Sequence, residues 1–305
     1  MMNIAGSIVA LITPMDEQKS VDFKALDRLI EFHVSNGTDG IVSVGTTGES
    51  ATLSVDEHLS VVERTVKQVA GRIPVLAGTG ANSTREAIYL TRQAAELKVD
   101  AVLLVVPYYN KPGQEGLYQH YKAIADAVPV PQYLYNVPGR TVADMSNQTI
   151  HRLAEIENIV GCKDATGDLT RGRELIELCG DRLTILSGDD ATALKLIKLG
   201  ARGDISVTAN AAPRQMHKMC AAALRGDFAT AEAIDQTLSR LHRDLFVESN
   251  PIPVKYAVSR LGYTCNSLRL PLTPLAENNR AAVDAAMQAA EVTETSNKFA
   301  QTNRI

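Results

Sequence analysis

The chain has 305 residues, 45% of them apolar, which is enough to bury a substantial core in one large α/β domain or two smaller ones. It carries 31 basic and 35 acidic residues with no basic stripe and no apolar run of membrane-spanning length, which argues against nucleic acid and membranes as partners. Four dispersed cysteines without a CxxC pair indicate a reduced, cytoplasmic compartment, with the thiols as small core residues: Cys162, Cys179, Cys220 and Cys265.

Eight short apolar or β-branched runs alternate with amphipathic stretches. The first run, SIVALITP, has no positively charged segment before it, so we interpret it as a strand and not as part of a signal peptide. A helical pattern follows each run; after the first, Leu26, Leu29, Ile30 and His33 share one face and Gly37 is expected to cap the helix. The runs span residues 7–14, 40–45, 74–80, 101–107, 131–138, 159–166, 183–189 and 203–210.

Apolar runs of this kind suit parallel strands covered on both faces, and eight strand–helix units predict a closed TIM (β/α)8 barrel. Residues 1–226 are expected to form this catalytic barrel domain. Residues 227–305 are expected to form a C-terminal helical region with a polar tail from about residue 292. Barrel enzymes place their chemistry at the C-terminal ends of the strands, so the polar residues that follow each run are the candidates for function.

Lys163 lies inside the run IVGCKDAT. Alternation along a strand places Ile159, Gly161, Lys163 and Ala165 on one face and Asp164 on the other. Asp164 is therefore a poor ion-pair partner for the Lys163 amine. The small residues Gly161 and Ala165 are expected to leave room around that amine. Burial of an unpaired ammonium is costly and favours the neutral, nucleophilic amine that Schiff-base chemistry needs. The alternative is a strand-edge lysine that reaches solvent or a distant carboxylate.

Tyr135 ends the preceding run and is expected to stand next to Lys163, where its phenol can pass protons during imine formation. Ordinary packing at the rim is the alternative for this tyrosine. Arg140, just beyond YNVP, has the fork that binds a carboxylate bidentately, although a solvated loop arginine is the commoner case.

Three site types are not supported. The stretch GTGANS resembles a dinucleotide fingerprint, but Ser83 replaces the third glycine and no acidic residue ends the next run. The stretch GTTGES lacks the lysine of a nucleotide-binding P-loop. The six histidines form no HxxxH pair and no cluster with carboxylates, so no metal site is expected.

Eight motifs occur in order with matching spacing: VGTTGES, AGTGAN, PYYNKP, YNVPGRT, GCKDATG, LSGDD, ISVTAN and NPIPVK. Together they closely resemble the dihydrodipicolinate synthase (4-hydroxy-tetrahydrodipicolinate synthase) family, in the N-acetylneuraminate lyase superfamily of pyruvate-dependent class I aldolases. The resemblance runs from about Gly6 to Ala290. It implies a lyase that condenses pyruvate with L-aspartate 4-semialdehyde in lysine and diaminopimelate biosynthesis, with no metal or organic cofactor.

The resemblance also implies roles for the matched residues. Lys163 would form the imine with pyruvate, and Tyr135, Thr46 and Tyr109 would form its proton relay, with Tyr109 reaching the site of a neighbouring subunit. A tyrosine shared in this way requires at least a dimer, and the family commonly forms a homotetramer, a dimer of dimers.

Substrate binding is implied at five positions. Thr46 and Thr47 would bind the pyruvate carboxylate, Arg140 would bind the carboxylate of the semialdehyde, and backbone groups of Gly188 and Ile205 would line the site.

A feedback site for L-lysine is implied at a subunit interface. Val55 departs from the family pattern, because well-known inhibited bacterial members carry a histidine there, and this leaves the strength of inhibition open. Glu86 suits the ammonium group of the effector. The matching residues are Ser50, Ala51, His58, Asn82, Glu86 and Tyr108.

Two other functions are considered. A related aldolase, such as N-acetylneuraminate lyase or a keto-deoxy sugar acid aldolase, would share the lysine and tyrosine, but it would need a polyol-binding wall where this chain has Arg140 and a Thr-Thr pair. A barrel that has lost catalysis and only binds a ligand is the other alternative.

Overall fold

The computed structural model describes residues 4–292, apart from the side chain at position 181. Residues 293–305, which make up nearly all of the expected polar tail, lie outside the described residues. Two buried apolar clusters form the core: one fills the inside of a barrel, and a larger one lies between the strands and the surrounding helices.

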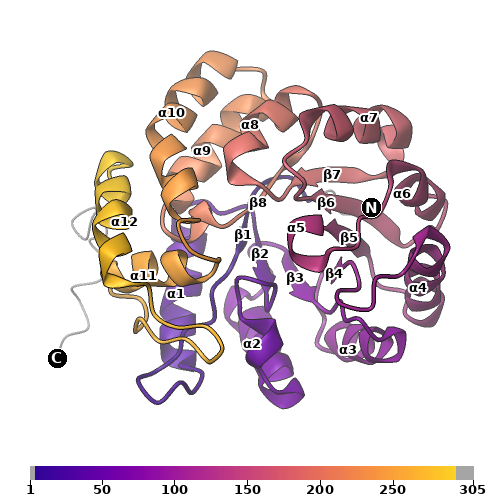
Figure 1. Cartoon of the computed structure of the whole chain (residues 1–305), viewed down its shortest axis with the longest axis horizontal. Coiled ribbons are helices and arrows are strands. Elements are labelled where there is room, and N and C mark those ends of the chain that lie inside the picture. Colours follow the sequence, from indigo (N-terminus) through magenta and orange to yellow (C-terminus); the bar gives the residue numbers. More distant parts are fainter. Residues whose placement is uncertain (1–3, 293–305) are drawn as a thin grey trace.

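Eight parallel strands close into a barrel in sequence order, which confirms the predicted TIM (β/α)8 fold (Figure 1). Each strand is shorter than the run that predicted it, because the last residues of the run leave the sheet and form the loop at the C-terminal rim. The strands are β1 (Gly6–Ala10), β2 (Gly40–Ser43), β3 (Val75–Gly78), β4 (Ala101–Val105), β5 (Gln132–Asn136), β6 (Ile159–Asp164), β7 (Thr184–Ser187) and β8 (Gly203–Ser206).

Helices follow every strand and surround the barrel (Figure 1). Several begin at a residue whose side chain accepts a backbone N–H, as Asp22, Ser54, Ser83, Ser146 and Asp168 do. The longer ones are α1 (Phe23–Ser35), α2 (Val55–Val69), α3 (Thr84–Glu96), α4 (Gln114–Ala127), α6 (Asn147–Leu153), α7 (Leu169–Cys179), α8 (Asp190–Lys198) and α9 (Pro213–Leu224). Single turns are η1 (Ser50–Thr52), α5 (Pro138–Thr141), η2 (Gly180–Arg182) and η3 (Thr208–Asn210).

The first helix shows how the sequence pattern becomes structure. The predicted apolar face of α1, Leu26, Leu29, Ile30 and His33, is buried against the barrel. Gly37 follows the C-cap and takes a φ of +83°, the left-handed conformation that glycine adopts most easily after a helix.

The barrel closes where β1 pairs with β8. Gly203 has a φ of +152°, and a Cβ placed there would lie 2.1 Å from the carbonyl oxygen of Gly6. A side chain at Gly203 would therefore force the two strands apart, so closure at this point requires glycine.

The pairing of β5 with β6 contains a bulge. Gln132 pairs with Ile159 and Tyr133 with Gly161, so Val160 is the extra residue. Ile159 packs in the outer cluster and Val160 in the inner one. Our expectation that Ile159 shares the face of Lys163 is therefore wrong, because the bulge breaks the alternation below Gly161.

The room beside Gly161 does not belong to the lysine either. A Cβ on Gly161 would lie 2.2 Å from Cε1 of Tyr133, so the tyrosine ring occupies the space that the missing side chain leaves. This corrects the expectation that Gly161 leaves room around the amine.

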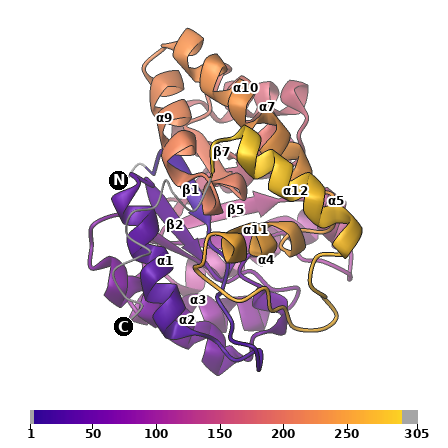
Figure 2. The same ribbon diagram turned by 90° about the vertical axis from the view of Figure 1, so that its left-hand side faces the viewer.

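Three further helices follow the barrel: α10 (Phe228–Asp244), α11 (Ile252–Arg260) and α12 (Glu277–Ala289). Figures 1 and 2 show them together on one side of the barrel, with α10 packed along α9 and α12. Seven of the nine residues of α11 are buried, so this helix is covered on nearly all sides. The proposed division near residue 226 falls between α9 and α10 and stays a prediction.

Of the four cysteines, Cys162, Cys179 and Cys220 are buried as expected, but Cys265 is exposed. The expectation of a core thiol is wrong for Cys265 because it lies in the irregular segment between α11 and α12. Within residues 4–292, no helix has the length and apolar character needed to cross a membrane.

Candidate active site

A cavity of about 330 Å³ opens among the loops at the C-terminal ends of β2 to β5. This is the end of the barrel at which the sequence placed the chemistry. Three of the residues expected to act in catalysis or substrate binding line the cavity: Thr46, Tyr135 and Arg140. Five of the expected effector residues line it as well: Ser50, Ala51, His58, Glu86 and Tyr108.

Lys163 projects from β6 into the barrel and is only 5% exposed. Its register partner on β5 is Tyr135, as predicted, and its Nζ lies 4.3 Å from the centre of the Tyr135 ring. The aromatic face provides a favourable contact for a cationic amine. Asp164 points the other way, toward Arg171, which confirms that it is no partner for the lysine.

The space for the lysine stem comes from the next strand. A Cβ on Gly188, just after β7, would lie 2.6 Å from Cε of Lys163 and 2.8 Å from Cβ of Ala165. Any larger residue at Gly188 would therefore displace the lysine. Ile205 on β8 is 1% exposed and belongs to the cluster inside the barrel.

The GTTGE loop, residues 45–49, follows β2. Thr46 is half-buried, whereas Thr47 is 3% exposed. Glu49 has a φ of +58°, and Thr13 holds the loop by donating its hydroxyl hydrogen to the carbonyl of Gly48 at 2.7 Å. A loop with left-handed residues needs such external contacts to keep one shape.

A buried ion pair anchors this loop to the C-terminal helices. Lys255 of α11 donates to the Glu49 carboxylate, and the two side chains are 0% and 1% exposed. Burial lowers the pKa of Lys255, and the neighbouring Glu49 carboxylate opposes that shift. The backbone N–H of Arg269 also donates to Glu49, at 3.3 Å, and the Arg269 guanidinium pairs with Glu57 at 2.6 Å.

Asn250 connects the two expected carboxylate-binding positions. Its side-chain amide donates to the Thr47 hydroxyl at 3.0 Å, and its backbone carbonyl accepts a hydrogen bond from the Arg140 guanidinium at 3.1 Å. We assigned no role to Asn250 or Lys255 from the sequence. The signal was present in NPIPVK, where a lysine directly follows four apolar residues at the start of a helix.

Tyr109 lies at the tip of the loop after β4, where it is 90% exposed with a φ of +75°. The backbone of the loop is held by Asn82, whose side chain donates to the Tyr108 carbonyl at 3.2 Å and whose carbonyl accepts from Asn110 at 2.9 Å. The Tyr109 ring thus lies on the surface of the chain. That it reaches the active site of a neighbouring subunit stays a prediction.

Five of the six expected effector residues share the cavity with Thr46 and Arg140, and Asn82 does not line it. Nε2 of His58 contacts the Gly78 carbonyl at 2.9 Å, and burial lowers the pKa of this histidine. Partial burial and the Glu86 carboxylate raise the pKa of Tyr108. Val55, the departure from the family pattern, also lines the cavity and is 39% exposed.

A buried lysine beside a tyrosine, at the C-terminal end of a closed (β/α)8 barrel, is the arrangement expected of a lyase of the class I aldolase type. The sequence model of the dihydrodipicolinate synthetase family matches residues 3–290. The chain therefore belongs to this family.

Individual relatives agree. The 4-hydroxy-tetrahydrodipicolinate synthase of Thioalkalivibrio sulfidiphilus is 60% identical over 288 residues, which cover 94% of this chain and 98% of the relative. The crystal structure of dihydrodipicolinate synthase from Acinetobacter baumannii, complexed with pyruvate, is 55% identical with a TM-score of 0.94, covering 95% of this chain and 99% of that one.

Two more distant structures bear on regulation and assembly. The enzyme from Cyanidioschyzon merolae with lysine bound is 38% identical, with a TM-score of 0.92, and covers 96% of this chain and 100% of that one. A monomeric dihydrodipicolinate synthase variant is also 38% identical, with a TM-score of 0.93, and covers 95% of this chain and 97% of that one.

The Glu49–Lys255 pair generates a stability prediction. Lys255→Met leaves a buried carboxylate without its counter-ion, and we expect it to lower the free energy of unfolding by about 3–5 kcal/mol. Urea denaturation measures this loss. The double variant Glu49→Gln, Lys255→Met removes the unpaired charge and is expected to recover much of it.

The control is Lys67→Met, which breaks the exposed Lys67–Glu63 pair, whose side chains are 66% and 47% exposed. It is expected to cost less than about 1 kcal/mol. Equal losses in Lys255→Met and Lys67→Met would show that burial gives the Glu49–Lys255 pair no special weight.

Proposed function

We propose that this protein is a 4-hydroxy-tetrahydrodipicolinate synthase, which condenses pyruvate with L-aspartate 4-semialdehyde in lysine and diaminopimelate biosynthesis. The observation that carries the proposal is the pairing of Lys163 with Tyr135 beside a cavity that contains Thr46 and Arg140. The 60% identity to the 4-hydroxy-tetrahydrodipicolinate synthase of Thioalkalivibrio sulfidiphilus supports it.

In the first half of the reaction, Lys163 forms a covalent imine with pyruvate. Its amine attacks the keto carbon of pyruvate, and loss of water gives an imine that serves as an electron sink. Loss of a methyl proton then gives the enamine, which attacks the aldehyde of the second substrate. Cyclisation by the amine of that substrate releases the product from Lys163, so the sequence of steps requires no metal or organic cofactor.

Proton transfer needs a relay, because imine formation moves protons between nitrogen, oxygen and water. In the proposal, the Tyr135 phenol is its centre and Thr46 its next member. Tyr109 of a neighbouring subunit completes the relay, which is consistent with a ring that is 90% exposed on an isolated chain.

Substrate carboxylates are assigned to two places. Thr46 and Thr47 bind the carboxylate of pyruvate, with Thr47 held by Asn250, while Gly188 and Ile205 line the site beside the imine. Arg140 binds the carboxylate of the semialdehyde. Its guanidinium already bonds the Asn250 carbonyl, which orients the fork toward the cavity that it lines.

This arrangement favours the proposed reaction over sugar acid cleavage. The cavity presents Arg140 and Thr46 to small carboxylates beside apolar residues: Val44, Leu53, Ala81, Leu103, Val105 and Val137. A polyol chain requires hydrogen-bonding partners along its length, and the proposal assigns the polar side chains Ser50, His58, Glu86 and Tyr108 to the effector.

The first prediction concerns the imine. Incubation with pyruvate and borohydride is expected to trap one reduced pyruvate per chain on Lys163, detected by intact mass and peptide mapping. Lys163→Ala should give no adduct and lose activity by about a thousandfold or more. The absence of an adduct in the wild-type protein, or one at another lysine, would exclude the aldolase mechanism and leave a non-catalytic barrel.

The second prediction concerns the other substrate. With pyruvate and aspartate semialdehyde coupled to the next reductase, the protein is expected to turn over. Arg140→Ala should lower kcat/KM for the semialdehyde by about 10- to 100-fold, because a charge-assisted hydrogen bond contributes about 1.5–3 kcal/mol. Turnover of a sugar acid in its place would favour the rival aldolase.

Regulation and assembly complete the proposal. L-Lysine would bind in the part of the cavity formed by Ser50, Ala51, His58, Glu86 and Tyr108, with Asn82 holding the Tyr108 loop. A homotetramer, a dimer of dimers, would bring Tyr109 into a second active site. The proposed compartment is the cytoplasm.

The third prediction is inhibition by L-lysine. Initial rates are expected to fall in the millimolar range or below, and Glu86→Gln should weaken inhibition by about tenfold through loss of a charge-assisted contact to the effector's ammonium group. Full activity at millimolar lysine would overturn the proposed feedback. Val55→His tests whether the departure from the family pattern weakens binding.

A further inference from the structure

The residues that follow Tyr135 and Lys163 form a second pair on the opposite face of the sheet. Asn136 and Asp164 are register partners at the ends of β5 and β6, and they are 0% and 4% exposed. Both point outward, away from the catalytic cavity. Their polar side chains are buried beneath the segment that connects β5 to α6, so each of them needs a partner there.

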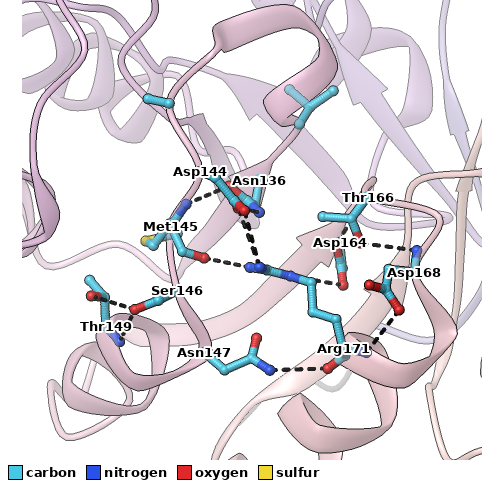
Figure 3. Close-up of polar contacts among 12 residues, drawn as sticks. Asn136, Asp144, Met145, Ser146, Asn147, Thr149, Asp164, Thr166, Asp168 and Arg171 are labelled. Carbon is cyan, nitrogen blue, oxygen red and sulfur yellow. Dashed lines mark hydrogen bonds and ion pairs between the residues drawn. The ribbon is translucent and has the colours of Figure 1, made fainter.

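Arg171 of α7 supplies contacts to this region (Figure 3). Its guanidinium donates to the Met145 carbonyl, pairs with Asp144 at 3.3 Å, and lies 3.8 Å from the Asp164 carboxylate. Asp144 in turn accepts a hydrogen bond from the Asn136 amide at 2.8 Å. One arginine fork therefore links the end of β6 to the chain that leaves β5.

The chain that leaves β5 carries Arg140. We define residues 137–146 as the strap: it contains the single turn α5, with Arg140, and then runs back along the sheet to α6. A helix of four residues has no stability of its own, so contacts elsewhere must determine where the strap lies.

The far end of the strap is held at three points. The backbone N–H of Met145 donates to the Asn136 side chain at 3.0 Å, and Gln114 of α4 donates to the Asp144 carbonyl at 2.7 Å. Arg171 makes the third attachment and is the one that reaches the strand of Lys163. Its side chain is only 16% exposed, whereas that of Asp144 is 50% exposed.

We propose that Arg171 is a positioning residue for the second substrate: through Asp144 and Met145 it fixes the strap, and with it Arg140, relative to the strand that carries Lys163. The inference rests on the proposed function, because it takes Arg140 as the group that binds the semialdehyde carboxylate. Arg171 itself lies on the outer side of β6 and contacts no reacting atom.

The charges around Arg171 support this role. Burial raises the pKa of Asp164, and the nearby guanidinium opposes that rise. Removal of Arg171 leaves Asp164 buried without its only strong counter-charge among the described contacts, and it leaves the Met145 carbonyl without its guanidinium donor. The strap then loses its connection to β6 but keeps the two attachments through Asn136 and Gln114.

The expected consequence is specific to one substrate. Pyruvate binds at the GTTGE loop and Lys163, which the strap does not hold, whereas the semialdehyde depends on the placement of Arg140. A displacement of about 1 Å in a positioned group can cost up to about 100-fold in rate. We expect Arg171→Met to raise KM for the semialdehyde about tenfold and to leave KM for pyruvate within about twofold.

The experiment measures both KM values, kcat, the rate of borohydride trapping with pyruvate, and the thermal midpoint for the wild type and four variants. Arg171→Lys keeps the charge but not the fork, so it should fall between wild type and Arg171→Met. Arg173→Met, on the exposed face of the same helix, is the matched control and should behave as wild type. Asp144→Ala breaks the same link at a half-exposed position and replaces Arg171→Met if that variant does not fold.

The outcomes separate this inference from the proposed function. If wild type neither traps pyruvate nor turns over the semialdehyde, the proposed function fails. If wild type is active but Arg171→Met and Asp144→Ala only lower the thermal midpoint, or raise both KM values equally, Arg171 is structural and the inference is overturned. A rise confined to KM for the semialdehyde, with unchanged trapping, supports it.

Discussion

The buried ion pair between Glu49 and Lys255 is the contact on which the active end of the barrel depends. It joins the loop after β2 to α11, a helix that follows the last strand by more than forty residues of chain, and it does so where neither side chain reaches water. An ion pair of this kind gains little net stability over apolar packing, but it has one correct geometry. That geometry determines the shape of the GTTGE loop and places Asn250 against Thr47 and Arg140.

The lysine at the centre of the site is accommodated by its neighbours. Tyr133 fills the gap at Gly161, Gly188 leaves space for the lysine stem, and the Tyr135 ring covers the amine. Tyr133 and Tyr135 lie on β5, Gly161 lies on β6 with the lysine, and Gly188 comes just after β7. Lys163 is thus placed by the packing of three neighbouring strands, which resists displacement because a barrel interior is close-packed.

Five of the six proposed effector residues line the same cavity as Thr46, Tyr135 and Arg140. The loop that presents Thr46 to the active site continues directly into Ser50 and Ala51, and Tyr108 adjoins Tyr109 in the chain. In the proposal, a ligand beside Glu86 would contact the same two loops that carry Thr46 and Tyr109 of the proposed proton relay. Coupling between the two proposed sites would need no long pathway, since both ligands would contact the same short segments.

The sequence by itself determined the barrel, the eight strands, and the neighbouring positions of Lys163 and Tyr135, because strand order and alternation are local patterns that a parallel barrel translates directly into space. The family motifs added the remaining site residues, whose roles stay predictions. The tertiary structure alone decided the bulge at Val160, the filling of Gly161 by Tyr133, the exposure of Cys265 and the contacts of Lys255, Asn250 and Arg171. These features depend on residues up to about two hundred positions apart. A buried charged side chain needs a partner, but the sequence does not show which distant carboxylate or carbonyl it will contact.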